Sequence, residues 1–208
     1  MTKITCMPPA LQFSLANCKA MLWSILFTEF LIFSTACRKA KGPPPAYETV
    51  SLEGSDQKKV FKRDSLGNLL VEGVIFQGKR NGSWVTYHPS GQVETITNYL
   101  EDRKNGLYLR FGQNNQIEEQ ASYMDDLLEG TFIRYQFGHL DERIEYKAGK
   151  KNGRAIKYYL RGGMQREMEF KDDVQDGFYR FYGEDGTKQI EEVYRAGKKV
   201  SGGIILSK

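Results

Sequence analysis

Residues 75–99 read IFQGKRNGSWVTYHPSGQVETITNY, and this stretch returns along the chain with almost constant length. Its first residue has an aromatic counterpart in each later copy, at separations of 24, 24, 23, 24 and 24 residues. The set is Ile75, Tyr99, Tyr123, Tyr146, Phe170 and Tyr194. A glycine keeps the same phase, at Gly82, Gly106, Gly130, Gly153, Gly177 and Gly202. Six units in phase predict a repeat architecture in which each unit packs on its neighbours.

Each unit has the pattern of two β-strands and two turns. The first strand follows the glycine and is aromatic and β-branched, as pleated surfaces favour: 83–87, 107–111, 131–135, 154–158 and 178–182. The second strand alternates apolar and polar residues with period two, as in 93–99, 140–146 and 164–170. The favoured residue pairs of tight hairpins predict the turns between units at Asn81-Gly82, Asn105-Gly106, Asn152-Gly153 and Asp176-Gly177. We therefore expect an all-β fold, an elongated stack or meander of antiparallel β-hairpins over residues 60–208.

Two aromatic rows of opposite parity run through the units. One row is expected to form a structural ladder and consists of Tyr87, Phe111, Tyr135, Tyr158 and Tyr182. The other row lies two residues after the glycine and consists of Trp84, Tyr108, Phe132 and Tyr179, with alanine at the fourth unit. Two interpretations of this second row stay open, a strip that binds a protein partner and a second packed face.

The N-terminal part predicts an exported lipoprotein. Residues 1–36 are interpreted as a signal peptide with a hydrophobic helix, because the apolar run 21–36 is too short to span a membrane. The segment Ser34-Thr35-Ala36-Cys37 resembles the lipobox of bacterial lipoproteins, which implies that Cys37 is lipidated. Residues 37–59 open with a lysine- and proline-rich stretch and are expected to form a flexible tether. Two or three acyl chains would hold the protein at a membrane of the bacterial cell envelope, inner or outer.

The repeats resemble MORN repeats, in which an aromatic residue precedes a Gly-Lys-x-x-Gly turn and another aromatic. That core stands here at 76–84, at 146–153 and, in part, at 194–199. The chain is most similar to bacterial MORN-variant proteins that are described as antitoxin-like components of toxin–antitoxin modules. The resemblance covers residues 60 to about 205 and implies the β-hairpin stack. An aromatic replaces the second glycine of the eukaryotic pattern, which weakens the transfer of the phospholipid binding that is ascribed to eukaryotic members.

The residues with catalytic chemistry are few. No cysteine follows Cys37, so neither a thiol nucleophile nor a Cys/His metal cluster is available beyond it. The two histidines, His88 and His139, stand in equivalent turns and are expected to face solvent. The net charge of +4 is small, and turns of opposite charge alternate along one edge, which disfavours a phosphate track. We therefore expect no enzyme activity, no cofactor, no metal, no nucleic acid and no small-molecule substrate.

The remaining functions are those of a surface. We expect a non-catalytic protein-binding or scaffolding module, held at a membrane by its lipid and contacting an as yet unknown protein partner. Strand edges that accept another chain and the aromatic strip offer the contact surfaces. The alternative is an intracellular antitoxin-like protein that neutralises a toxin by direct binding. A carbohydrate-binding module that uses exposed aromatics is a third interpretation, without a motif to support it.

Overall fold

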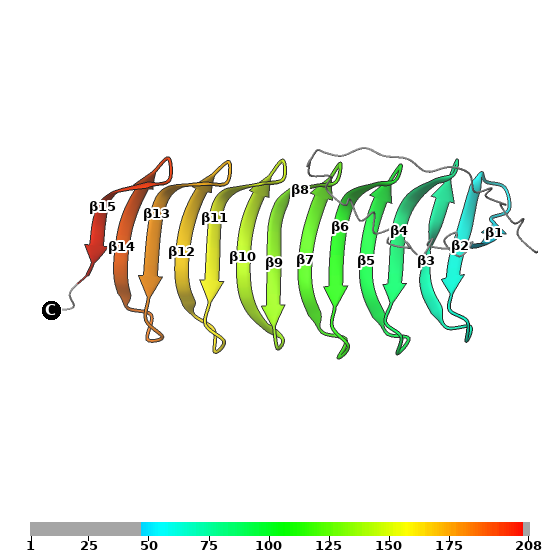
Figure 1. Ribbon diagram of the computed structural model, residues 1–208, viewed down its shortest axis with the longest axis horizontal. Coiled ribbons are helices and arrows are strands. Elements are labelled where there is room, and N and C mark those ends of the chain that lie inside the picture. The colour runs from blue at the N-terminus through cyan, green and yellow to red at the C-terminus, as the bar shows by residue number, and fades with distance from the viewer. Residues whose placement is uncertain (1–46, 206–208) are drawn as a thin grey trace, which may run out of the picture. The chain divides into compact units, whose positions relative to one another are not determined.

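The computed structural model describes residues 47–205, which form one antiparallel sheet (Figure 1). Neighbouring strands follow one another along the chain, so the sheet is a meander, with only the two-residue β8 off the path. The strands are β1 Glu48–Ser51, β2 Gln57–Arg63, β3 Leu69–Phe76, β4 Lys79–Tyr87, β5 Val93–Leu100, β6 Arg103–Phe111, β7 Ile117–Met124, β8 Leu127–Leu128, β9 Gly130–Gln136, β10 His139–Lys147, β11 Lys150–Tyr158, β12 Met164–Lys171, β13 Val174–Tyr182, β14 Lys188–Arg195 and β15 Lys198–Ile204. The expected all-β stack of antiparallel hairpins is confirmed.

The sheet is a single layer over the whole described range. Figure 1 shows the strands side by side in one curved row, and among residues 47–205 no helix or second sheet covers either face. Few side chains are consequently buried. The buried ones are Val60, Trp84, Thr97, Ala121, Ile144, Ala155, Ile156 and Glu167. Most aromatic side chains are half-buried, because each is covered only by its neighbours within the same face.

The sheet begins earlier than the sequence indicated. Strand β1 and the start of β2 lie inside residues 37–59, which were expected to be a tether. Thr49 of β1 pairs with Val60 of β2, and Val60 is 1% exposed. Burial of Val60 requires a strand on each side of β2, and β1 supplies the outer one. The signal peptide, Cys37 and the rest of the expected tether lie outside the described residues.

The tight turns between units are not the Asn-Gly pairs, so that prediction was wrong. Both central residues have positive φ at Gln77-Gly78, Glu101-Asp102, Asp125-Asp126, Ala148-Gly149, Asp172-Asp173 and Ala196-Gly197. These pairs connect the strands directly, as type I′ turns do. Asn105-Gly106 instead lies inside β6, where the pairing with β5 shifts register between Thr97 and Tyr99. The repeat glycine, which has positive φ, therefore lies at a β-bulge within a strand and not in a turn.

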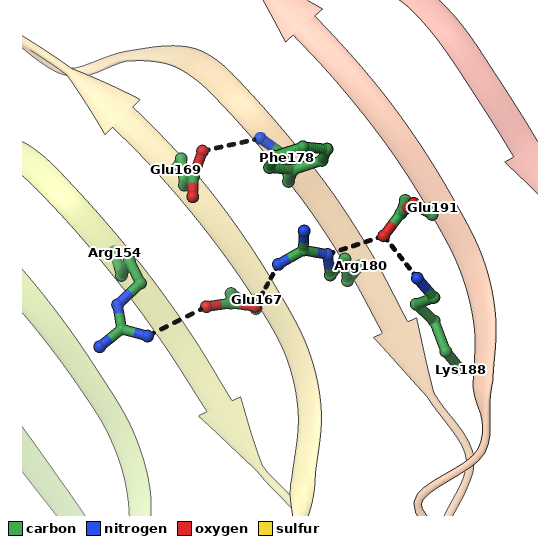
Figure 2. Close-up of polar contacts among 7 residues, drawn as sticks. All are labelled: Arg154, Glu167, Glu169, Phe178, Arg180, Lys188 and Glu191. Atoms are coloured by element: carbon green, nitrogen blue, oxygen red, sulfur yellow. Dashed lines mark hydrogen bonds and ion pairs between the residues drawn. The ribbon is translucent and has the colours of Figure 1, made fainter.

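At the bulges of Gly153 and Gly177, a carboxylate from the neighbouring strand occupies the space that the glycine leaves. Glu169 of β12 accepts the backbone N–H of Phe178 at 3.0 Å, next to Gly177 of β13 (Figure 2). A Cβ on Gly177 would lie 2.0 Å from Oε2 of Glu169. Glu145 has the same place over Gly153 one unit earlier. Glycine is thus required for its φ and for the absence of a side chain.

We expect Gly177→Ala to lower the free energy of unfolding by about 1.5 kcal/mol, because alanine is strained at positive φ and also displaces Glu169. Gly186→Ala is the matched control, since Gly186 has φ +81° and nothing within 4 Å of the added Cβ. It should cost about 1 kcal/mol from backbone strain alone. Urea denaturation followed by circular dichroism measures both. If both variants lost the same free energy of unfolding, the contact with Glu169 would not contribute to the cost of Gly177→Ala.

Candidate binding surfaces

The row of Trp84, Tyr108, Phe132 and Tyr179 runs along the middle of one face of the sheet, which we name the aromatic face. Strand register places a smaller or aliphatic residue beside each of these aromatics. The cross-strand neighbours are Thr97 for Trp84 and Tyr108, Ala121 for Tyr108, Ile144 for Phe132 and Met168 for Tyr179. Alternating large and small residues let the aromatic rings lie over their neighbours. The row is therefore a packed centre of the face.

Trp84 is the most tightly held member of the row. It is 7% exposed, and its Nε1 donates to the backbone oxygen of Val74 at 3.0 Å. The indole lies over Gly73 of β3, where a Cβ would come within 2.3 Å of the ring. The edges of Tyr47 and Tyr99 close the sides, with ring centroids 6.0 and 6.3 Å away. Little of Trp84 is left for a partner.

The other members of the row are half-buried and make similar pairs. Tyr108 lies edge-to-face with Tyr123, and Phe132 with Tyr146, at centroid distances of 5.9 and 6.3 Å. Burial raises the pKa of the Tyr108 hydroxyl. Tyr179 stands beside Met168 and is also half-buried. Binding of a partner along the exposed parts of Tyr108, Phe132 and Tyr179 stays a prediction.

Cations cover the ring faces on this side of the sheet. The guanidinium of Arg80 lies 3.9 Å from the ring centroid of Tyr99 and 5.8 Å from that of Trp84. Lys104 lies over Tyr123 in the next unit, at 4.8 Å. A groove of about 590 Å³ opens beside Trp84, with Tyr47, Arg80 and Tyr99 among its walls. Arg80 therefore occupies the ring face of Tyr99 on which a sugar could otherwise stack.

The opposite face carries the structural ladder of Tyr87, Phe111, Tyr135, Tyr158 and Tyr182, which we name the ladder face. The Tyr87 hydroxyl donates to Glu72 at 2.5 Å, and burial together with this bond raises the pKa of Tyr87 to about 12. His88, expected to face solvent, is half-buried, and its Nε2 lies 3.1 Å from the backbone oxygen of Phe111 in the next unit. His139 is exposed, as expected.

An ion-pair ladder, which sequence reasoning missed, crosses the last four internal strands on the ladder face (Figure 2). Glu167 of β12 is 6% exposed and accepts from Arg154 at 3.4 Å and from Arg180 at 3.1 Å. Arg180 continues to Glu191 at 2.8 Å, and Glu191 to Lys188 at 2.6 Å. Hydrogen bonds from Lys188 and Arg180 lower the pKa of Glu191.

The signal for this ladder was present in the repeat. In the earlier units the same row holds the apolar residues Val85, Ile96, Leu109 and Ile133, interrupted by Glu72, Gln120 and Arg143. From β12 onward the row changes to Glu167, Arg180 and Glu191, which register places directly opposite one another. Opposite charges at cross-strand positions stabilise a sheet pair.

A second ionic group lies on the aromatic face at the middle of the sheet. Arg134 contacts Asp141 at 3.2 Å, and Lys157 contacts the other oxygen of Asp141 at 2.6 Å. Arg110 pairs with Glu119 at 2.9 Å two strands earlier. Burial opposes ionisation of Asp141, but its hydrogen bonds to Lys157 and Arg134 outweigh burial and lower its pKa. All these carboxylates are neutralised by cations, so the group is a structural network.

The described part of the chain offers no assembled metal or membrane-spanning element. Within residues 47–205, His, Cys, Asp and Glu side chains do not gather in groups that could hold a metal ion. Over the same residues, no helix is long and apolar enough to cross a membrane. The surfaces that the sheet does offer are its two faces and its two terminal strands.

The hairpin of β4 and β5 is the unit that the comparisons identify. Residues 80–101 match the family model described as MORN repeat variant. The match spans these two strands and ends at the first residue of the following turn. The same strand–bulge–strand arrangement returns in the pairs β6–β7, β11–β12 and β13–β14. MORN repeats are generally associated with binding or scaffolding. No curated protein matches the chain.

Proposed function

We propose that this protein is a non-catalytic binding or scaffolding module that is held at a bacterial membrane surface as a lipoprotein. The observation that supports a surface function is the single-layer sheet. Both faces of the sheet and the outer edges of β1 and β15 are open to contact within the described residues. The MORN repeat variant match at residues 80–101 supports the same class of function.

The sequence around Cys37 supports attachment through this residue. Cys37 directly follows an apolar run and three small residues, and no other cysteine stands between it and Lys208. Acylation at this position places the β-sheet about ten residues from the membrane, since β1 begins at Glu48. An extended chain of that length reaches roughly 35 Å, which leaves the sheet free to contact proteins beside the membrane.

The lipid anchor is tested by growing bacteria that express the full chain with an alkyne-bearing fatty acid. We expect the label on the wild-type protein in the membrane fraction, with residues 1–36 removed. In Cys37→Ser the label should be lost entirely, because serine cannot form the thioether that carries the diacylglycerol.

Cys18→Ser is the matched control and should retain label and membrane location, because Cys18 lies in the part that is removed. An unlabelled wild-type protein with an intact Met1 in the soluble fraction would contradict the anchor. That result would instead favour the intracellular antitoxin-like alternative.

A further inference from the structure

The repeats are joined at one edge of the sheet by a recurring backbone contact. In each turn between units, the second residue donates its N–H to a carbonyl in the preceding unit. The pairs are Asp102 to Arg80, Asp126 to Lys104, Gly149 to Leu128, Asp173 to Lys151 and Gly197 to Gln175, at 2.9–3.0 Å. Each unit therefore offers a docking position that the turn of the following unit fills.

Charge is matched at each of these positions. The basic pairs 79–80, 103–104 and 150–151 receive turns with two acidic residues, at 101–102, 125–126 and 172–173. Lys79 contacts Glu101 at 3.3 Å, and Arg103 contacts Asp125 at 3.3 Å. The neutral pairs 127–128 and 174–175 receive the neutral turns at 148–149 and 196–197. An acidic turn thus follows a basic pair and a neutral turn follows a neutral pair.

The last basic pair that the structure describes, at 198–199, has no turn of a following unit over it within residues 47–205. Lys198 and Lys199 open β15, the final strand of the sheet. Lys199 contacts Glu192 at 2.6 Å, whereas Lys198 forms no ion pair within residues 47–205. In the internal units each basic pair receives an acidic turn, so the pair at 198–199 is expected to accept an acidic turn as well.

The other end of the same sheet carries an acidic turn at the same edge. The β1–β2 loop contains Glu53 and Asp56, and Figure 1 shows it on the edge where the tight turns lie. Gly54 has φ +74°, close to the value of the second turn residue in the internal units. Glu53 is exposed and, over the described residues, has no cationic partner.

We propose that a second copy of this chain docks head-to-tail, with its β1 strand paired antiparallel to β15 and its Glu53 turn over Lys198. The strand directions permit this arrangement. Strand β15 leaves the edge that carries the tight turns, and β1 runs toward that edge, so adding β1 beyond β15 continues the antiparallel meander. The two sheets then form one longer sheet.

The hydrogen-bonding register is also compatible. Ile205 donates to Gln189 at 2.7 Å, so alternation along an antiparallel strand turns the amide of Ile204 outward. Leu52 donates to Gln57 at 3.1 Å, and the same alternation turns the amide of Thr49 outward. Ile204 can therefore pair with Tyr47 of the second copy, and Gly202 then lies opposite Thr49, which continues the middle row of the aromatic face.

Apolar surface is available on both strands. Ile204 is 78% exposed on β15, and Tyr47 beside β1 is 49% exposed. In this register the two side chains lie next to each other on the aromatic face. A head-to-tail contact does not close on itself, so it predicts open chains that lengthen as the protein concentration rises. This inference concerns assembly and does not depend on the lipid at Cys37.

Charge reversal on the full chain in detergent micelles tests the contact. We expect wild type to form dimers and longer chains in analytical ultracentrifugation. Lys198→Glu alone and Glu53→Lys alone should each weaken association roughly three- to tenfold, because each replaces an attraction by a repulsion. A mixture of the two variants should recover association as alternating chains. At one contact between unlike copies the carboxylate introduced at position 198 meets the ammonium introduced at position 53, and at the other contact the unchanged Lys198 meets the unchanged Glu53, whereas contacts between like copies stay repulsive.

A backbone variant tests the strand pairing. Ile204→Pro removes an outward amide without removing a hydrogen bond to β14, so it should abolish association, while Ile204→Val should retain it. Circular dichroism verifies that each variant folds. A monomeric wild type at about 100 μM, or no recovery in the mixture, would overturn the proposal. Loss of association in Ile204→Pro with no effect of Glu53→Lys would instead indicate a tail-to-tail dimer of β15 and would also overturn it.

Discussion

Trp84→Ala is expected to lower the free energy of unfolding by about 3–4 kcal/mol, the largest effect that we expect of a truncation to alanine in the sheet. Trp84 is 7% exposed and fills the hollow above Gly73. Truncation removes the apolar contacts of the indole and leaves the backbone oxygen of Val74 without the donor at 3.0 Å. It also removes the ring against which Tyr47 and Tyr99 pack. Urea denaturation monitored by far-ultraviolet circular dichroism measures the loss.

Phe137→Ala is the matched control for an aromatic residue that is not packed. Phe137 lies in the turn between β9 and β10 and is 76% exposed. Its truncation should change the free energy of unfolding by no more than about 0.5 kcal/mol. If Trp84→Ala lost as little free energy of unfolding as Phe137→Ala, the indole would not be part of the core. That result would favour the interpretation of Trp84 as part of a strip that binds a protein partner.

The repeat period predicted the fold because it reports which residues must lie side by side. Residues 24 positions apart, such as Trp84 and Tyr108, lie in the same row two strands apart. Parity alone correctly separated the row of Trp84 from the row of Tyr87. The packing around Trp84 was harder to predict from the sequence. It depends on Gly73 and Thr97, which flank Trp84 only after β3 and β5 have paired with β4. Small residues on adjacent strands carry no signal in a single-strand pattern.

The turns were misplaced because local propensity was applied without the neighbouring unit. Asn-Gly is the favoured turn pair in an isolated hairpin, whereas Glu101-Asp102 is not. In the sheet, Asp102 accepts the backbone N–H of Arg80 at 3.0 Å and returns its own N–H to the oxygen of Arg80. These bonds between units offset the strain of positive φ at an aspartate. The hydrogen bond lowers the pKa of Asp102, as expected for a carboxylate that accepts backbone donors.

The two ends of the sheet differ in what the sequence revealed. Strand β15 lies within residues 60–208, where the repeats were expected, although no strand was predicted at 198–204. Strand β1 precedes the first repeat, so the repeat period does not extend to it. The role of β1 is visible only from Val60, whose burial requires a neighbour on both sides. An edge strand that differs from the repeat is typical of stacked architectures, since the terminal unit covers the stack instead of continuing it.

Removal of the buried carboxylate of the ion-pair ladder should have the second largest effect. We expect Glu167→Ala to lower the free energy of unfolding by about 2.5 kcal/mol, because two charge-assisted hydrogen bonds are lost and Arg180 keeps its charge in a partly buried position. The value stays below that of a fully buried pair, since the Arg154 side chain is 52% exposed and remains hydrated. Glu101→Ala is the control, because its pair with Lys79 is exposed on both sides and should contribute less than about 0.5 kcal/mol.

A double substitution tests whether the ion-pair ladder stabilises the sheet through its charges or through the shape of its side chains. Glu167→Leu combined with Arg180→Leu restores the apolar character that Leu109 and Ile133 give the same row in earlier units. Glu191 then keeps its contact with Lys188 at 2.6 Å, so no carboxylate is left without a cation. We expect the double variant to unfold within about 1 kcal/mol of wild type, and Glu167→Leu alone to be clearly less stable. Equal losses for the single and double variants would mean that the ladder contributes through shape and not through its charges.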